Sequence, residues 1–489
     1  MEAVSWLDVG IIIAYLMGMI GVGVWSLKKV KSLGDYSLAQ GSLGYPVMIG
    51  TLVGACIGAA STFGKAGKAY QVGSFLFFAT LGYSIGLAWF GRFSRRLREE
   101  KIWTIPEVIR KRYGLGMELS MGGVMLIAVI AVFGGQIIGM GAIFTAVGKS
   151  FGLTYTSAII IAAGVIIFYT LVGGMYAVAY TDLIQSAIMI LGIGIILPAF
   201  ILTAAAGKGD FWVMLRPPSG NLLGGMSPLY VVSIFLIDIP FCLVDPSLWQ
   251  RSQAAKSDRV IQGSALVSAG IYTYWSLICV GLGVLGAVLI PNVAERFGSS
   301  DAIIPALTIR YLPSGLVGFC LAGMMAVMMS TASVALLITG TTLSNDLVRP
   351  LRPGISEKAL IYSARITVLA VGVLGVIFAL WIKNLFDLLL LAFAVYVSGV
   401  FFPVMAALYW DKATRAGAMV SSVAASIIVI ALYALNKPWN IEPIMVSLTV
   451  SAVLMAAVSL ATYTPETATP RILRRKSAER NCPAAMGKG

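Results

Sequence analysis

Residues 46–73 read PVMIGTLVGACIGAASTFGKAGKAYQVG, a segment long enough to cross a bilayer as a helix but rich in glycine and carrying two lysines. A lysine near the middle of a transmembrane helix costs about 2.5–3.5 kcal/mol on insertion scales. Each glycine weakens a helix by about 1 kcal/mol relative to alanine. Irregular backbone at membrane depth is tolerated only where it lines water or protein. We therefore expect a broken helix here, with a solute or ion site at the break.

The rest of the chain has the composition of an all-α integral membrane protein. Of its 489 residues, 58% are hydrophobic and 11% are charged, which leaves too little polar surface to cover a soluble globule. At about 20 apolar residues per span, we predict about thirteen transmembrane helices. They centre near residues 17, 58, 84, 133, 163, 192, 238, 274, 328, 369, 397, 426 and 452. These spans form one membrane domain, residues 1–463, and we expect residues 464–489 to be a disordered cytoplasmic tail.

The basic residues predict the orientation of the chain in the cell (inner) membrane. Only Glu2 and Asp8 precede or open the first span, so we interpret it as an anchor with the N-terminus outside. Most of the 35 lysines and arginines, Arg251 among them, fall in alternate loops on the side of the C-terminus. The positive-inside rule makes that side cytoplasmic. The net charge of +14 then reflects orientation and contact with the lipid bilayer, with no nucleic-acid partner, and leaves the oligomeric state open.

The sequence argues against an enzyme. It contains no histidine, which excludes histidine bases, Ser/His/Asp and Cys/His nucleophile systems and most catalytic zinc sites. The five cysteines are odd in number and show no metal-binding spacing. We predict no catalytic residues and no enzyme cofactor.

A second break is expected in the seventh predicted span. This span carries Asp238 and Asp245, and Pro240 and Pro246 interrupt it. Interrupted helices five spans apart are typical of inverted-repeat transporters. The alternative is that the prolines only kink a helix whose neighbours satisfy the backbone. The pattern alone leaves both interpretations open.

The ninth predicted span contains adjacent hydroxyls, Ser330 and Thr331, followed by Ser333. Hydroxyls in an apolar helix commonly bond to a neighbouring helix or to the i−4 carbonyl. The functional alternative is a sodium site, since Na⁺ prefers hard oxygen ligands such as hydroxyls and the carbonyls freed at a helix break.

Residues 173–185 read GGMYAVAYTDLIQ and resemble the signature of the sodium:solute symporter family. Four more segments agree with the family in order and spacing: DYSLAQGSLG (35–44), GKAGKAYQVG (64–73), QRSQAAK (250–256) and FPVMAALYWDKATRAG (402–417). The resemblance covers nearly the whole membrane domain. It implies a LeuT-type core of five plus five inverted spans, spans 2 to 11, with one extra helix before it and two after it.

The resemblance also implies residues for sodium. The family's sodium site matches carbonyls and hydroxyls of Gly54, Ile57, Val327, Ser330 and Thr331. Asp182 would lie on the inner exit path of the ion; the alternative is a carboxylate that binds free N–H groups at a helix start. Some members bind a second sodium ion. Ser333 fits that pattern, but Val334 stands where another hydroxyl would be, which argues against a second ion here.

The family's solute cavity implies another group of residues, namely Ser61, Lys65, Lys68, Gln136 and Asp245. Lys65 departs from the family, which has a small or apolar residue there. It would bind a carboxylate of the substrate, form a fixed ion pair with Asp238 or Asp245, or act as a tethered cation that partly replaces a coupling ion. The sequence does not decide among these, although an unpaired buried ammonium is disfavoured.

These observations predict a sodium-coupled secondary active symporter that imports a small polar organic solute by alternating access. The lysines favour a carboxylate-bearing solute, such as an amino acid or an organic acid. The alternatives are a proton-coupled or uncoupled carrier of the same fold, or a transporter-like solute sensor.

Overall fold

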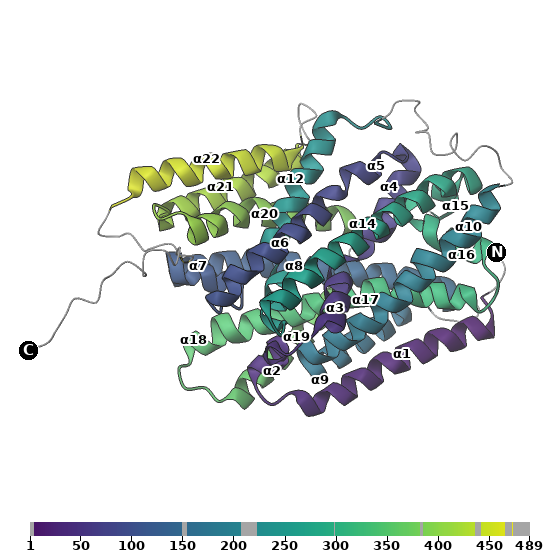
Figure 1. Ribbon diagram of the computed structural model, residues 1–489, viewed down its shortest axis with the longest axis horizontal. Coiled ribbons are helices and arrows are strands. Elements are labelled where there is room, and N and C mark those ends of the chain that lie inside the picture. The colour runs from purple at the N-terminus through teal and green to yellow at the C-terminus, as the bar shows by residue number, and fades with distance from the viewer. Residues whose placement is uncertain are drawn as a thin grey trace, which may run out of the picture.

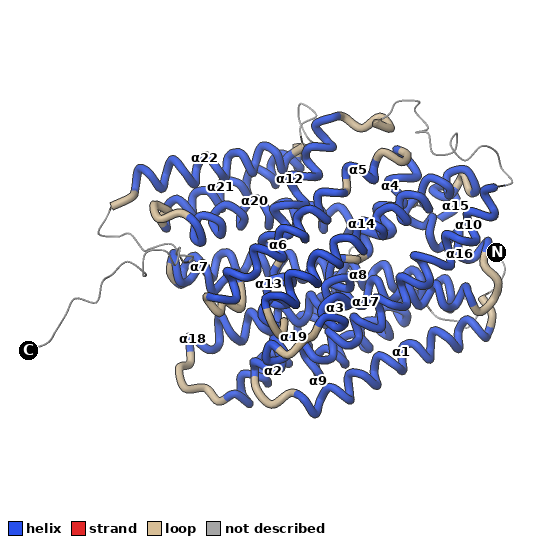
Figure 2. The backbone as a smooth tube through the Cα atoms, in the orientation of Figure 1, coloured by secondary structure: helices blue, strands red, loops and turns tan. Residues whose placement is uncertain are grey.

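The computed structural model describes residues 4–148, 154–206, 223–297, 299–381, 385–435, 442–464 and 472. Within these residues the chain is all-helical, as predicted, and Figure 2 shows helix along nearly the whole coloured tube. Eight helices are long and apolar enough to cross a membrane, or up to ten if each of two bent pairs is one span. The protein is therefore a multi-pass membrane protein, by the length and composition of its helices.

The helices lie side by side in one bundle (Figure 1). One end of the bundle carries α15 (Val293–Phe297) and α16 (Ile303–Tyr311), and we call it the α16 end. The other carries α7 (Ile105–Tyr113) and α18 (Arg349–Leu351), and we call it the α7 end. The long helices are α1 (Trp6–Ser26), α6 (Leu81–Glu99), α8 (Leu115–Gly148), α9 (Tyr155–Met189), α14 (Asp258–Leu289), α17 (Leu316–Thr342), α19 (Glu357–Trp381), α20 (Leu385–Tyr409), α21 (Arg415–Ala434) and α22 (Pro443–Thr462).

Helix α17 occupies the centre of the bundle. The most apolar window of its span is 94% buried, against 28% for the span that begins with α1. A helix that is apolar on all sides suits such a central position, because every face meets other helices. Residues of α17 are therefore placed to contact several surrounding elements at once.

Helix α9 is sharply kinked at Gly174, where the backbone has φ 53° and ψ −140°. A Cβ atom at this position would lie 2.4 Å from the carbonyl oxygen of Tyr36. The positive φ and this close approach both require glycine. Beyond the kink the helix continues through the π-helical turn η5 (Ile190–Ile196) into α10 (Leu197–Ala206).

Two helices are broken. Helix α3 (Tyr45–Cys56) bends by 67° into η3 (Ala60–Gly64) and α4 (Lys65–Val72), which confirms the predicted break. Helix α12 (Pro228–Val244) meets α13 (Pro246–Ala254) at 40°. The expectation that Pro240 also interrupts the helix is wrong, because Pro240 lies inside α12 and the helix continues through it. Asp245, with φ −72° and ψ 114°, ends α12 instead.

A short backbone bridge joins the two broken helices at the α7 end. Leu43, just before α3, donates its N–H to the carbonyl of Ala254 at 3.0 Å and accepts from the N–H of Lys256 at 2.9 Å. This parallel pairing, Leu43 with Ala255, connects the start of α3 to the end of α13. The two half-helices are therefore linked through their main chains.

Candidate ion and solute site

The break after α3 leaves backbone groups without helical partners. Ile57 is extended, with φ −97° and ψ 102°, so the carbonyls in the last turn of α3 have no N–H ahead of them in a regular helix. On the other side of the break, Ser61 Oγ accepts from the N–H of Gly58 at 2.9 Å, and Gln136 Oε1 accepts from the N–H of Ala59 at 3.1 Å. Side chains thus satisfy the N–H groups of Gly58 and Ala59 at the break.

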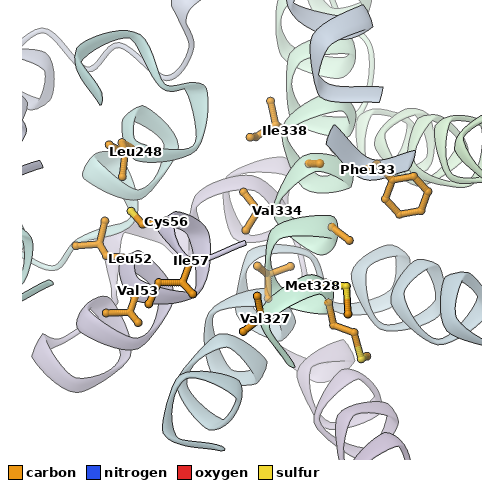
Figure 3. Packing of buried hydrophobic residues seen from close by; sticks show 14 of the residues in the cluster. Leu52, Val53, Cys56, Ile57, Phe133, Leu248, Val327, Met328, Val334 and Ile338 are labelled. Atoms are coloured by element: carbon orange, nitrogen blue, oxygen red, sulfur yellow. The ribbon is translucent and has the colours of Figure 1, made fainter. Parts of the chain in front are cut away.

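One hydroxyl of α17 meets a carbonyl at the break, and its neighbour bonds within α17. Thr331 Oγ1 donates to the carbonyl of Ile57 at 3.2 Å, and Ser330 Oγ donates to the carbonyl of Val327 at 3.1 Å. Figure 3 shows Ile57 at the end of α3 beside Val327 of α17. Four of the residues predicted to bind sodium therefore lie together, and Gly54, the fifth, is in the last turn of the same half-helix.

The chemistry of this group of atoms suits an alkali cation. Its oxygens are neutral carbonyls and hydroxyls, which are hard ligands. Across the described residues, no cluster of three or more His, Cys, Asp or Glu side chains could hold a metal ion. The site therefore resembles a place for a transported cation more than a centre for a transition metal.

Asp182 lies next to this group in the middle of α9. It is fully buried and accepts from Thr51 Oγ1 at 2.6 Å and from Arg251 Nη2 at 3.1 Å. Its other oxygen, Oδ1, is buried without a hydrogen-bond partner and would be 3.3 Å from a Cβ at Gly54. The alternative of a helix-start carboxylate is wrong, because Asp182 is bound by side chains inside a helix.

Arg251 is the functional candidate that sequence reasoning missed. The sequence predicts it among the basic residues of loops, but it lies in α13 with no exposed surface. Besides Asp182, its guanidinium donates to the carbonyl of Thr51 at 3.0 Å and to that of Ser247 at 3.3 Å. It therefore joins α3, α9 and α13. The available signal was its place in the QRSQAAK motif, within two turns of Pro246.

A cavity of about 1460 Å³ begins at the break and reaches the α16 end, where Val4, Phe297 and Asp301 line it. Thr331 lies on its wall, and so do all the residues predicted to contact the solute: Ser61, Lys65, Lys68, Gln136 and Asp245. Among described residues, α7 contributes nothing to the wall. A solute can therefore approach the break from the α16 end, whereas the Asp182–Arg251 contact lies on the other side of it.

Lys65 is buried on the cavity wall, with 8% of its surface exposed. Its Nζ donates to Ser276 Oγ at 2.6 Å and lies 4.7 Å from the ring centroid of Tyr272. Its charge interacts with that of Asp238, but in the described part of the chain no acidic oxygen comes within 4.0 Å of it. The described structure thus shows no fixed ion pair of Lys65 with Asp238 or Asp245. Its contact partners Ser276 and Tyr272 are not among the site residues predicted from the sequence.

The other predicted solute residues have partial structural roles. Lys68 lies 5.7 Å from the ring centroid of Tyr230, close to the mouth of the cavity. Asp245 Oδ1 accepts from the N–H of Ser247 at 2.7 Å and so caps α13. Asp245 is thereby fixed at the second break, as Ser61 and Gln136 are at the first.

Ser333 and Val334, the residues considered for a second ion, are neighbours in α17 with different surroundings. Ser333 Oγ donates to the carbonyl of Ser330 at 2.9 Å, and Ser333 is fully buried. Val334 lies on the cavity wall and offers no oxygen from its side chain (Figure 3). Val334 therefore contributes no side-chain oxygen to a second ion.

Comparison with known proteins agrees with this geometry. The model of the sodium:solute symporter family matches residues 36–425. The chain is 28% identical over 422 residues to the sodium/myo-inositol cotransporter 2 of Mus musculus, covering 77% of this chain but only 61% of that relative. It is 26% identical over 455 residues to the sodium/proline symporter of Staphylococcus aureus, covering 89% of this chain and 87% of the relative.

Solved structures share the fold. A substrate-bound, outward-open Na⁺-coupled sialic acid symporter superposes with a TM-score of 0.79 at 16% identity, covering 94% of this chain and 98% of the other. Mhp1, a nucleobase-cation-symport-1 family transporter in a closed conformation, superposes with a TM-score of 0.62 at 13% identity, covering 91% and 97%. These proteins and the sequence relatives are transporters and not enzymes. Since the family model covers most of the sequence, this chain belongs to the sodium:solute symporter family.

Proposed function

We propose that this protein couples the inward flow of sodium to the uptake of a small polar organic solute by alternating access. The observation that carries the proposal is the contact between Thr331 Oγ1 and the carbonyl of Ile57. It brings a hydroxyl of the central helix to a carbonyl at a helix break, and such oxygens can replace the hydration shell of a cation. Family membership supports sodium as that cation.

Sodium would bind between α3 and α17, at Gly54, Ile57, Val327, Ser330 and Thr331. The hydroxyls now donate to carbonyls, and a cation would instead draw all these oxygens toward itself. It would hold the break against α17 and so fix the wall from which Ser61 and Lys65 face the cavity. Sodium and solute must then raise each other's affinity by the same factor.

Release of sodium would require the α7 end to open. Asp182 lies beside Gly54 and has one carboxylate oxygen without a partner, so it is placed to receive the ion as it leaves the site. Arg251 competes for the same carboxylate. We infer that the Asp182–Arg251 contact closes the exit path while the cavity is accessible from the α16 end.

The thirteen-span count and the inverted repeat belong to the same proposal. The segment Tyr155–Ala206 has 52 residues and would extend about 78 Å as one straight helix, more than twice the apolar thickness of a bilayer. The kink at Gly174 divides it into two spans. With α6, α20 and the two bent pairs also crossing the membrane, the count becomes thirteen, and the breaks at Ile57 and Asp245 fall five spans apart.

We propose the orientation that the basic residues predict, with the N-terminus outside the cell (inner) membrane and the C-terminus in the cytoplasm. The cavity then opens to the outside, because Val4 lies on its rim. The membrane domain would comprise residues 1–463. The predicted tail, residues 464–489, lies outside the described residues except for Thr464 and Ile472.

The relatives support a solute that carries a carboxylate. The names of the relatives include a proline symporter, and the structural neighbour is a sialic acid symporter; both solutes are carboxylates. A myo-inositol cotransporter also appears among the relatives, and its solute is a neutral polyol. Lys65 and Lys68 on the cavity wall favour the carboxylate.

Purified protein in proteoliposomes tests the sodium site. We expect ²²Na⁺ uptake and a rise in unfolding temperature with NaCl but not with choline chloride. Thr331→Ala and Ser330→Ala should abolish both effects, whereas Thr331→Ser, which keeps the hydroxyl, should retain them. Sodium coupling is refuted if the wild type shows neither effect and the alanine variants behave like it.

A further inference from the structure

Two side chains of opposite charge line the cavity without forming an ion pair in the described structure. Lys65 comes from α4 and Asp238 from α12, and both lie on the cavity wall. Their charges interact, yet in the described structure their nitrogen and oxygen atoms are more than 4.0 Å apart. Each charge is therefore partly desolvated and lacks a counter-ion in contact.

The ammonium of Lys65 is only partly satisfied. It has three N–H donors, of which one is used by Ser276 Oγ at 2.6 Å. The ring of Tyr272, with its centroid 4.7 Å away, stabilises the positive charge but accepts no strong hydrogen bond. The group can therefore donate to a further oxygen, and a carboxylate is the acceptor that compensates its charge.

Asp238 is held on the cavity wall by its packing against α6. Its Cβ would be 3.1 Å from a Cβ at Gly82, so its backbone packs tightly against the first turn of α6. The carboxylate also interacts with the backbone of Tyr83 in that turn. Among described basic residues, none makes an ion pair with it, so a cationic group from a solute can fill that role.

The other charged residues of the cavity make contacts of their own or lie nearer its mouth. Asp245 caps α13 through Ser247. Lys68 lies over Tyr230, and Asp301 packs against Gly67, where a Cβ would be 2.1 Å from its Oδ1. Lys65 and Asp238 are thus the two charges whose environment a bound solute changes most.

The pair of charges discriminates among solute classes. An anion would compensate Lys65 but be repelled by Asp238, and a cation would suffer the reverse. A neutral polyol would hydrogen-bond to both without supplying a counter-charge to either. A solute with neighbouring positive and negative groups compensates both, and buried charges are stable only when they are paired and hydrogen-bonded.

Aromatic rings border the same place. Tyr83 and Tyr272 stack with ring centroids 4.5 Å apart, and Phe241 lies 6.4 Å from Tyr83. All three line the cavity. These rings offer an apolar surface to the body of a solute and π-faces to an ammonium group.

We propose that the transported solute is dipolar, of the class of neutral α-amino acids, with its carboxylate at Lys65 and its ammonium group at Asp238. The proposal rests on the proposed function and narrows it, since it excludes organic acids without an amino group. Lys65 then serves as a specificity residue for the carboxylate and not as a substitute for the coupling ion.

A ligand series that removes one charge at a time tests the proposal on the wild type. The probes are neutral L-amino acids, their 2-hydroxy acids, in which the ammonium becomes a hydroxyl, their amides, in which the carboxylate becomes a carboxamide, and myo-inositol. Unfolding temperature and calorimetric affinity are measured in NaCl and in choline chloride. At least one amino acid should bind in NaCl, and its hydroxy acid and amide should each bind at least about tenfold more weakly.

Two variants assign each charge. Asp238→Asn should remove the preference for the amino acid over its hydroxy acid and keep the preference over the amide. Lys65→Gln should remove the preference for the amino acid over its amide and keep the preference over the hydroxy acid. The exposed residues Lys358 and Glu295 supply controls with matched charge changes, Lys358→Gln and Glu295→Gln, and neither should alter the preferences.

The outcomes separate this proposal from the symport itself. If a hydroxy acid or myo-inositol binds in a sodium-dependent way and as tightly as every amino acid tested, that result overturns the proposal of a dipolar solute but leaves sodium coupling intact. The same conclusion holds if sodium stabilises the wild-type protein but no amino acid stabilises it further. Failure of sodium to act on the protein refutes the proposed function instead. The wild-type series decides the matter even if a variant does not fold.

Discussion

Thr331 donates its hydroxyl to the carbonyl of Ile57 across 274 positions of sequence, at 3.2 Å. Ile57 is the residue at which α3 loses helical geometry, and Thr331 belongs to the central helix α17. The contact therefore holds the break after α3 against the buried central helix α17. A bound sodium ion would act on this contact directly, and the variants below test what depends on it.

Gly58→Ala should weaken the site. A Cβ at Gly58 would lie 2.8 Å from Thr331 Oγ1 and 3.3 Å from its Cγ2, so Thr331 must move away from the carbonyl of Ile57. Overpacking of this kind costs about 1–3 kcal/mol. We expect a lower unfolding temperature and a smaller rise with NaCl. Gly21→Ala in α1, where nothing lies within 4 Å of the new atom, is the control. A Gly58→Ala protein with the full sodium response would contradict this account.

Asp182 and Arg251 should behave as one unit. Removing either partner of a buried ion pair costs about 3–5 kcal/mol, because the remaining charge is left without compensation. Asp182→Asn and Arg251→Met should therefore each lower the unfolding temperature strongly, and the double variant should be less destabilised than their sum. The cycle is read from unfolding temperatures in detergent without sodium. Additive effects would show that the two side chains are not coupled.

Gln136 should matter through the backbone of the break. Its Oε1 accepts from the N–H of Ala59 at 3.1 Å, and Gln136→Leu would remove the acceptor of that half-buried donor at a cost of about 0.5–1.5 kcal/mol. We expect reduced stability and weaker solute binding. Gln136→Glu keeps an acceptor at the same place and should lose less. Equal losses in both variants would indicate that the amide, and not the acceptor, is required.

Sodium dependence should be hyperbolic, with a Hill coefficient of about 1. Val334 provides no oxygen beside Ser333, and Arg251 already supplies a positive charge to Asp182. Initial rates of solute uptake against sodium concentration, together with the ratio of ²²Na⁺ to solute flux, measure this. Two sodium ions per solute would show that Ser333 and Asp182 hold an ion despite Arg251.

The features that the sequence predicts well are those that the local chain determines. Glycine and lysine in residues 46–73 predict the break, which the structure confirms. The adjacent hydroxyls point to Ser330 and Thr331, and Thr331 does contact the break. Long-range partners could not be predicted in this way. The contact of Lys65 with Ser276 joins residues 211 positions apart and depends on how α4 packs on α14.

Hydropathy also fails to separate core from lipid-facing helices. The spans that begin with α17 and α1 have mean hydropathies of 2.0 and 2.1, yet their buried shares are 94% and 28%. Lipid tails and helix cores are equally apolar, so composition does not record which of the two a side chain meets. The sequence does not reveal the buried position of Arg251 for a related reason, because a basic residue near a predicted helix end is normally assigned to a loop.

The backbone bridge between Leu43 and Ala255 bears on the tightness of coupling. If α3 swung away alone, the bridge would break and leave N–H and C=O groups unpaired at the α7 end, where each unsatisfied group is costly. Retreat of α3 and α13 together keeps it intact. A half-opened state that admits solvent along one helix only is thereby penalised. In the proposed mechanism this would protect the cell against slippage, the futile dissipation of its sodium gradient without accumulation of solute.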